Sequence, residues 1–133
     1  MALDQGGKPG RTGLARVWAA TRYSWLGLKA AYRHEAAFRQ ELWVSVVLAA
    51  LAVLLADTFG HFVALTAPLV IVLVVELVNS AIESIVDRVS PDHHELSGRA
   101  KDMGSAAVFV SVCFAAVVWA VYVGGVLLQW TFK

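Results

Sequence analysis

ELVNSAIESIVD, which runs from Glu76 to Asp87, directly follows an uncharged segment rich in valine and leucine that extends from Thr58 to Val75. An apolar segment of that length is typical of a membrane-spanning helix. On such a helix, at about 100° per residue, five polar side chains of the stretch share one face: Glu76, Asn79, Ser80, Glu83 and Asp87. Ionisable groups at membrane depth are costly and usually mark function. We therefore expect the functional site on this face.

The composition indicates a membrane protein. Of the 133 residues, 59% are hydrophobic and only 16% are charged, whereas about 25% of the residues of an average soluble domain are charged. The length predicts a single domain over residues 1–133. The formal net charge is only +1, so we expect no nucleic-acid partner. The single cysteine excludes a disulfide bond within the chain.

An amphipathic helix that lies in the membrane interface is predicted over about residues 12–34. Its apolar stripe has the width of one buried helix face and consists of Leu14, Val17, Trp18, Trp25, Leu28 and Tyr32. Basic residues flank the stripe, as is typical of helices that meet anionic lipid head groups. The alternative is a helix that packs its stripe on the rest of the chain. No apolar core of a signal peptide precedes it, so we expect the chain to insert through its own spans.

Three further helices are expected to cross the membrane. The apolar run from Leu42 to Ala56 is too short by itself for a hydrocarbon core of about 30 Å, so flanking residues must extend it. Ser90-Pro91 should end the second span, because proline lacks an amide hydrogen and restricts the residue before it. Ser97 is the expected N-cap of the third. The spans are expected at about residues 38–57, 62–89 and 97–128.

The distribution of basic residues predicts the orientation. Seven of the eleven Lys and Arg residues precede Leu42, three lie within residues 88–101, and the turn after the first span has none. Because Lys and Arg favour cytoplasmic segments, the N-terminus and the second loop should be cytoplasmic and the C-terminus outside. The polar clusters of the chain then all lie toward the cytoplasmic face.

The chemistry of these polar residues leaves several functions open. Glu35, Glu83 and Glu76 could share a Mg²⁺ ion, and Lys101 could bind phosphate oxygens. No P-loop and no Gly-rich nucleotide motif occurs. The residues alone therefore fit a metal-assisted reaction at the cytoplasmic interface and a carboxylate pathway for protons or cations equally well. A third interpretation makes Asn79 and the glutamates a structural contact between helices.

Three segments in order resemble the bacterial integral-membrane diacylglycerol kinase family, whose members are small lipid kinases with three spans. The most specific is the opening stretch, which fits the signature E-x-x-N-S-x-x-E-x-x-x-D between Glu76 and Asp87. EAAFRQE, from Glu35 to Glu41, and HELSGRAKDMGSAA, from His94 to Ala107, complete the resemblance. It covers most of the chain, from about Arg16 to Ala107.

The resemblance implies an ATP-dependent kinase of phospholipid metabolism in the bacterial inner membrane. It would transfer the γ-phosphate of ATP to the primary hydroxyl of diacylglycerol and give phosphatidate. Mg²⁺ would be the cofactor and membrane lipids the surroundings. The implied fold is an all-α bundle with an interfacial helix and three spans, assembled as a homotrimer whose sites lie between subunits. A related branch phosphorylates undecaprenol, and this acceptor remains an alternative.

The resemblance also implies roles for individual residues. Glu76 would be the catalytic base, Glu35 and Glu83 the metal-binding carboxylates, and Asn79 a residue that organises the site. The residues expected to bind ATP are Arg16, Tyr23, Glu35, Glu83, Asp92, His93, His94, Lys101 and Asp102. The residues expected to bind the lipid are Arg16, Ala20, Thr21, Arg22, Tyr23, Ser24, Trp25, Lys29, Ala30, Ala31, Tyr32, Ala37, Phe38, Arg39, Gln40, Glu41, Glu76 and Ser105.

One position departs from the family, because His93 stands where many relatives have tyrosine. Aromatic stacking on adenine at this position is therefore not implied. The rival from another functional class is a small oligomeric transporter for protons or cations that uses Glu76 and Glu83 as a relay. Against it, a relay needs access from both sides of the membrane, whereas these carboxylates cluster with Lys101 and Asp102 on the cytoplasmic side.

Overall fold

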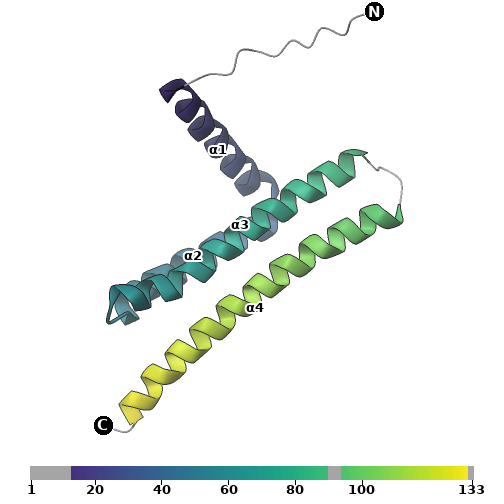
Figure 1. The fold of residues 1–133 in the computed structure, drawn as a ribbon. Helices are drawn as coiled ribbons and strands as arrows, with labels where there is room; N and C mark the ends of the chain where they lie inside the picture. The colour runs from purple at the N-terminus through teal and green to yellow at the C-terminus, as the bar shows by residue number, and fades with distance from the viewer. Residues whose placement is uncertain (1–12, 90–93, 132–133) are drawn as a thin grey trace, which may run out of the picture.

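The structure is a computed structural model that describes residues 13–89 and 94–131. Within these residues it consists of four α-helices and contains no strand (Figure 1). Three of the helices are long and apolar enough to cross a membrane. The expected all-α membrane fold, with one N-terminal helix followed by three long apolar helices, is therefore confirmed. The helices are α1 (Leu14–His34), α2 (Ala36–Leu55), α3 (Phe59–Val89) and α4 (Glu95–Thr131).

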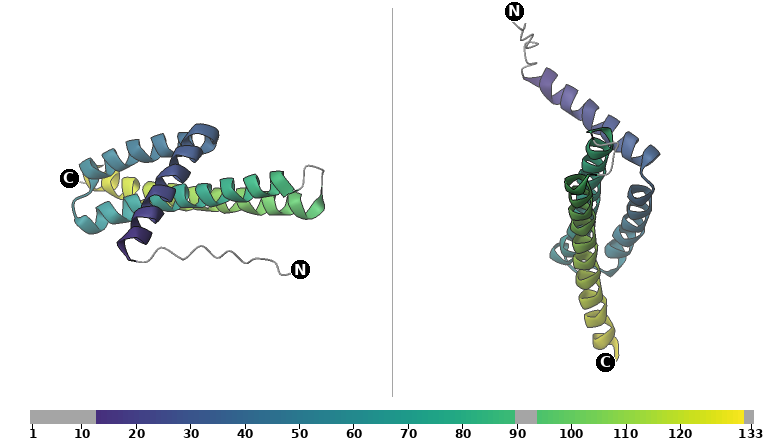
Figure 2. Two further views of the ribbon diagram at one scale, coloured as in Figure 1. Left: turned by 90° about the horizontal axis from the view of Figure 1, so that it is seen from above. Right: turned by 90° about the vertical axis from the view of Figure 1, so that its right-hand side faces the viewer.

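α3 and α4 form an antiparallel pair that lies side by side along most of its length, and α2 packs on α3 (Figures 1 and 2). The buried apolar side chains of α3 point into this small bundle, among them Leu65, Leu69 and Val72. Most other large apolar side chains of the spans are exposed in the single chain. Exposed apolar surface on this scale is expected where lipid or another membrane-embedded subunit covers it.

α1 leaves the bundle at a corner formed by one residue, Glu35. The backbone of Glu35 is extended, with φ −102° and ψ 113°, so it ends α1 and begins α2. The guanidinium of Arg39 donates hydrogen bonds to the carbonyl oxygens of Tyr32 (3.0 Å) and Arg33 (3.2 Å). These bonds serve carbonyl groups in the last turn of α1, which have no partner within the helix. The corner thus fixes Glu35 between the two helices.

The apolar stripe of α1 is exposed, with Leu14 at 88% and Trp18 at 74% of their full accessible surface. The buried residues of α1 are instead Ala19 and Ala31. In the single chain, therefore, most of the stripe is exposed, and only its C-terminal part, at Trp25, Leu28 and Tyr32, faces α2. This arrangement fits the interfacial helix better than the packed alternative.

Two long-range hydrogen bonds tie the helices together at the end opposite the polar face. The indole N–H of Trp119 on α4 donates to the carbonyl of Leu65, one turn before Pro68 within α3 (3.1 Å). The hydroxyl of Tyr122 donates to the carbonyl of Leu55 at the end of α2 (2.7 Å). α4 therefore contacts both neighbouring helices through side chains that bind main-chain oxygens.

The expected start of the last helix was wrong. α4 begins at Glu95, and Ser97 lies inside its first turn rather than at its N-cap. The residue that precedes the helix is His94, whose Nδ1 accepts a hydrogen bond from the backbone N–H of Leu96 (3.2 Å). The imidazole thus supplies the acceptor that a serine side chain commonly provides at this position.

Candidate functional site

The polar face of α3 passes from the interior of the bundle to its surface. Glu76 is 4% exposed, and Asn79 and Ser80 are each 8% exposed. Glu83, one turn further along, is half-buried, and Asp87 is exposed. The face therefore begins at a buried carboxylate beside the apolar part of α3 and ends at a carboxylate open to solvent. Such a gradient suits chemistry between one reactant held in the membrane and another in water.

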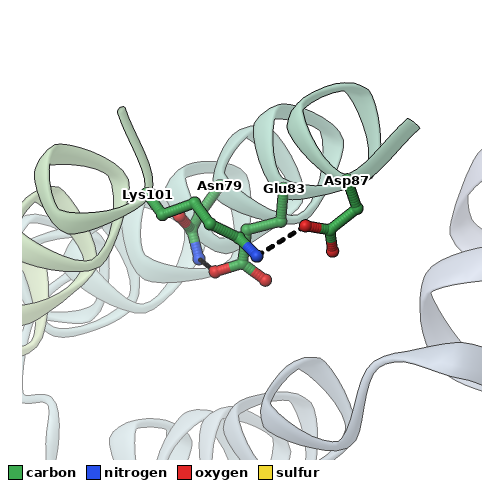
Figure 3. Close-up of polar contacts among 4 residues, drawn as sticks. All are labelled: Asn79, Glu83, Asp87 and Lys101. Atoms are coloured by element: carbon green, nitrogen blue, oxygen red, sulfur yellow. Dashed lines mark hydrogen bonds and ion pairs between the residues drawn. The ribbon is translucent and has the colours of Figure 1, made fainter. Parts of the chain in front are cut away.

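Asn79 joins its own turn of this face to the next turn, which carries Glu83. Its side-chain Nδ2 donates a hydrogen bond to Oε1 of Glu83 (3.2 Å; Figure 3). The same side chain packs against Gly104 of α4, where no Cβ is present. The sequence-based role of Asn79 as an organising residue remains a prediction, and this contact is consistent with it.

Lys101 of α4 lies at the outer end of the polar face. Its Nζ forms an ion pair with Oδ1 of Asp87 (2.6 Å), and in the view of Figure 3 the Lys101 side chain crosses that of Glu83 to reach Asp87. Their side chains are 40% and 65% exposed, respectively. The structure thus places one cation next to the carboxylates, on the neighbouring helix. The partnership with Asp87 could not be read from the sequence, because it depends on how α3 and α4 align.

Glu35 reaches the same region from the corner between α1 and α2. It lines a hollow of about 500 Å³ between α1 and α3, together with Ser80 and Ser84 of α3. Glu35 and Glu83 also lie near enough to Glu76 for their charges to act on it. His34 lines this hollow too, although the sequence did not single it out. A fourth glutamate, Glu41 of α2, also lies near Glu76.

Glu41 stands at one end of a largely apolar groove of about 410 Å³ between α2, α3 and α4. Among the described residues, its buried Oε2 has no hydrogen-bond partner. Gln40, next to it in the chain, lines the same groove. Polar atoms at the mouth of an apolar groove are the arrangement that an amphiphile would fill.

Several residues expected to bind lipid are brought together beneath the corner. Trp25, Lys29 and Tyr32 of α1 and Phe38 of α2 line one hollow of about 460 Å³. Other members of the set lie along the exposed side of α1, where the hydroxyls of Thr21 and Ser24 bind carbonyls of their own helix. Arg39, Glu41 and Glu76 are described above. Of the remaining members, Ala31 is buried, and the exposed ones are Arg16, Ala20, Arg22, Tyr23, Ala30, Ala37, Gln40 and Ser105.

Some residues expected to bind ATP are not near the polar face. Arg16 and Tyr23 are exposed on the N-terminal half of α1, which projects away from the bundle (Figure 1). His94 caps α4, and Asp102 is exposed beside Lys101. Asp92 and His93 lie outside the described residues. A single chain therefore brings together only part of the nucleotide set.

Glu35 and the polar face of α3 together offer carboxylates that fit a magnesium ion. Within the part of the chain that the structure describes, no three His, Cys, Asp or Glu side chains form a cluster that could hold a metal by themselves. Mg²⁺, however, usually binds one or two protein carboxylates and takes its other ligands from water and phosphate oxygens. Glu35 and Glu83, both near Glu76, supply that number of carboxylates. The donor set is therefore adequate for a metal that arrives with a nucleotide.

Comparison with known proteins gives one consistent result. A sequence model described as "Prokaryotic diacylglycerol kinase" matches residues 22–123. A diacylglycerol kinase of Pseudomonas aeruginosa is 51% identical over 111 residues, which cover 84% of this chain and 90% of the relative. One of Escherichia coli K12 is 48% identical over 111 residues (83% and 90%), and one of Haemophilus influenzae is 42% identical over 116 residues (87% and 95%).

Proposed function

This chain belongs to the prokaryotic diacylglycerol kinase family, and on that premise we propose that it transfers the γ-phosphate of ATP to the hydroxyl of diacylglycerol, giving phosphatidate. The observation that carries the proposal is the gradient along α3, from the buried Glu76 to the exposed Asp87. Diacylglycerol cannot leave the bilayer and ATP cannot enter it. A polar face that connects the two environments lets the reactants meet.

Glu76 is the proposed catalytic base. Its carboxylate would accept the proton of the lipid hydroxyl as the oxygen attacks the γ-phosphorus of ATP, and the bond between that phosphorus and the β,γ-bridging oxygen would break to release ADP. It is the most deeply buried member of the polar face, at the end next to the apolar part of α3, where a hydroxyl anchored by acyl chains would arrive. A base must lie within hydrogen-bond reach of the proton that it removes, and burial keeps water from competing for that position.

Glu35 and Glu83 are the proposed ligands of a Mg²⁺ ion that accompanies ATP. When bound, the metal would neutralise phosphate charge and orient the transferred group. Asn79 would hold the Glu83 carboxylate in place through the hydrogen bond to Oε1. Lys101, paired with Asp87 in the free protein, would turn its ammonium toward the phosphates of the nucleotide. Phosphoryl transfer requires chiefly such positioning and charge stabilisation from the protein.

The remaining nucleotide and lipid contacts are proposed from the family pattern. Arg16, Tyr23, His94 and Asp102, with Asp92 and His93 outside the described residues, would complete the ATP site. The hollow lined by Trp25 and Phe38 supports a lipid contact between α1 and the start of α2.

A homotrimer with sites shared between subunits is also proposed. Two features support it: the extensive exposed apolar surface of the spans, and the position of Arg16 and Tyr23 on a part of α1 that extends away from its own bundle. Residues that cannot reach the polar face of their own chain could complete the site of a neighbour. The proposed setting is the bacterial inner membrane, with the N-terminus and the loop between α3 and α4 cytoplasmic.

Phosphate transfer from γ-labelled ATP tests this function. The purified protein in mixed micelles is supplied with diacylglycerol and undecaprenol in parallel, with Mg²⁺ present or chelated. Mg²⁺-dependent label in phosphatidate is expected. Label only in undecaprenyl phosphate would keep the reaction and change the acceptor. No label in either lipid, from protein shown to be folded, would contradict the kinase function and favour the transporter.

A further inference from the structure

Gly104 of α4 makes the closest approach of any described glycine to a neighbouring helix. A Cβ built on it would overlap Oδ1 of Asn79, and it would stand 3.3 Å from the Cγ and 3.9 Å from the Cα of the same residue. The position that a side chain would occupy is therefore already filled by the Asn79 amide. Most other glycines of the helices have open space at the corresponding position.

The Asn79 amide cannot move away from Gly104 without weakening its hydrogen bond to Glu83. Its Nδ2 donates to Oε1 of Glu83, whereas its buried Oδ1 has no hydrogen-bond partner among the described residues and lies against Gly104. One short side chain therefore spans the space between Gly104 and Glu83. A Cβ at residue 104 would force the Asn79 amide to rotate. This rotation would take its Nδ2 away from the Glu83 carboxylate.

We infer that Gly104 is a positioning residue for the phosphoryl-transfer site: the absence of a side chain at Gly104 is what allows Asn79 to hold the Glu83 carboxylate. Gly104 itself has no side chain with which to bind substrate or metal. The inference rests on the proposed function for the meaning of Glu83, but the contact between Gly104 and Asn79 can be tested without it.

The same face of α4 contacts the polar face of α3 at a second point. Lys101, three residues before Gly104 and therefore on the same side of the helix, pairs with Asp87. Asp87 and Asn79 lie one turn on either side of Glu83 along α3 (Figure 3). α4 thus contacts the turns of α3 before and after Glu83. Gly104 packs against Asn79 in the turn before, and Lys101 pairs with Asp87 in the turn after.

The contact can be observed directly, because Asn79 is the only asparagine in the sequence. Selective ¹⁵N labelling of asparagine therefore gives one side-chain amide signal in an NMR spectrum of the whole protein in micelles. Gly104→Ala and Glu83→Gln should both shift this signal. Gly125→Ala is the matched control, since Gly125 lies on the same helix with nothing within 4 Å, and it should leave the signal in place. An unchanged signal in folded Gly104→Ala protein would overturn the inference.

The metal requirement supplies the functional readout. Partners that orient metal ligands typically contribute about 10- to 100-fold in metal affinity or activity. We therefore expect Gly104→Ala to raise the Mg²⁺ concentration at half-maximal turnover by about 10-fold or more, and Gly125→Ala to change it little. A purely structural defect would instead reduce the amount of folded protein and leave the Mg²⁺ dependence of the remainder unchanged, and this outcome would also overturn the inference.

A double-mutant cycle separates Gly104 from other effects. Asn79→Ala removes the amide that a Cβ at residue 104 would displace. Adding Gly104→Ala to Asn79→Ala should therefore have no further effect, and the double variant should require no more Mg²⁺ than Asn79→Ala alone. If the increases in Mg²⁺ requirement of the two single variants multiplied in the double variant, Gly104 would act independently of Asn79. That result would refute the inference. If the wild type showed no Mg²⁺-dependent transfer, the proposed function would fail. The amide signal would still decide whether Gly104 positions Asn79.

Discussion

Replacing Glu76 with glutamine should separate catalysis from folding more clearly than any other substitution in this chain. Glutamine keeps the size and shape of the side chain but cannot accept a proton as a carboxylate does. A positioned general base contributes about 10²- to 10⁴-fold to rate, which corresponds to about 3–5 kcal/mol of activation free energy. We therefore expect turnover of Glu76→Gln to fall by that factor at saturating ATP and lipid.

Glu76→Gln should leave the free energy of unfolding nearly unchanged or increase it. Glu76 is 4% exposed, and a buried neutral amide costs less free energy than a buried carboxylate. The free energy of unfolding should thus stay within about 1 kcal/mol of the wild type or rise. If Glu76 only joined helices, Glu76→Gln would alter folding or assembly and leave the turnover of each folded molecule intact.

The assay measures initial rates of phosphatidate formation in mixed micelles alongside unfolding of the same samples. Glu95→Gln is the matched control, because Glu95 is an exposed glutamate at the start of α4 that has no proposed role in the reaction. It should behave as the wild type in both measurements. Turnover of Glu76→Gln within threefold of the control would remove Glu76 from the role of base.

Four further substitutions test other parts of the account. Trp119→Phe removes the N–H that donates to the Leu65 carbonyl. The free energy of unfolding in detergent should fall by about 0.5–1.5 kcal/mol, with unchanged turnover per folded molecule. Equal stability would show that this hydrogen bond contributes nothing. Asp87→Asn breaks an exposed ion pair and should hardly affect the free energy of unfolding. Lys101→Met should raise the KM for ATP well above that of Asp87→Asn. Equal KM values for the two variants would limit Lys101 to a structural role. Glu35→Ala should raise the Mg²⁺ concentration at half-maximal turnover about 10- to 100-fold, and an unchanged requirement would refute its assignment as a metal ligand.

The polar face of α3 could be predicted because it lies within one helix. A period of 3.6 residues places Glu76, Asn79 and Glu83 on one side without any knowledge of the neighbouring helices. The long apolar runs identify the spans in the same way, since length and hydrophobicity are properties of the segment itself. Burial of Glu76 and Asn79 in the structure agrees with that face being turned toward protein.

Contacts between helices could not be predicted, because they depend on how the helices align. Nothing in the chain around Gly104 indicates that it meets Asn79, and nothing around Trp119 indicates the carbonyl of Leu65. The start of α4 was missed for a related reason: serine is the commoner cap, but here the imidazole of His94 provides the acceptor. The direction of α1 depends on the single extended residue at the corner, which has no distinctive sequence pattern.

The position of the metal tests the central claim most directly. Fe²⁺ can replace Mg²⁺ beside a non-hydrolysable ATP analogue, and with ascorbate and peroxide it cleaves the backbone close to the site where it binds. The account predicts cuts near Glu35 and near Glu83, both suppressed by excess Mg²⁺, in the wild type and also in the inactive Glu76→Gln protein. Cuts confined to other segments, or cuts that Mg²⁺ does not suppress, would contradict a phosphoryl-transfer site on the polar face of α3.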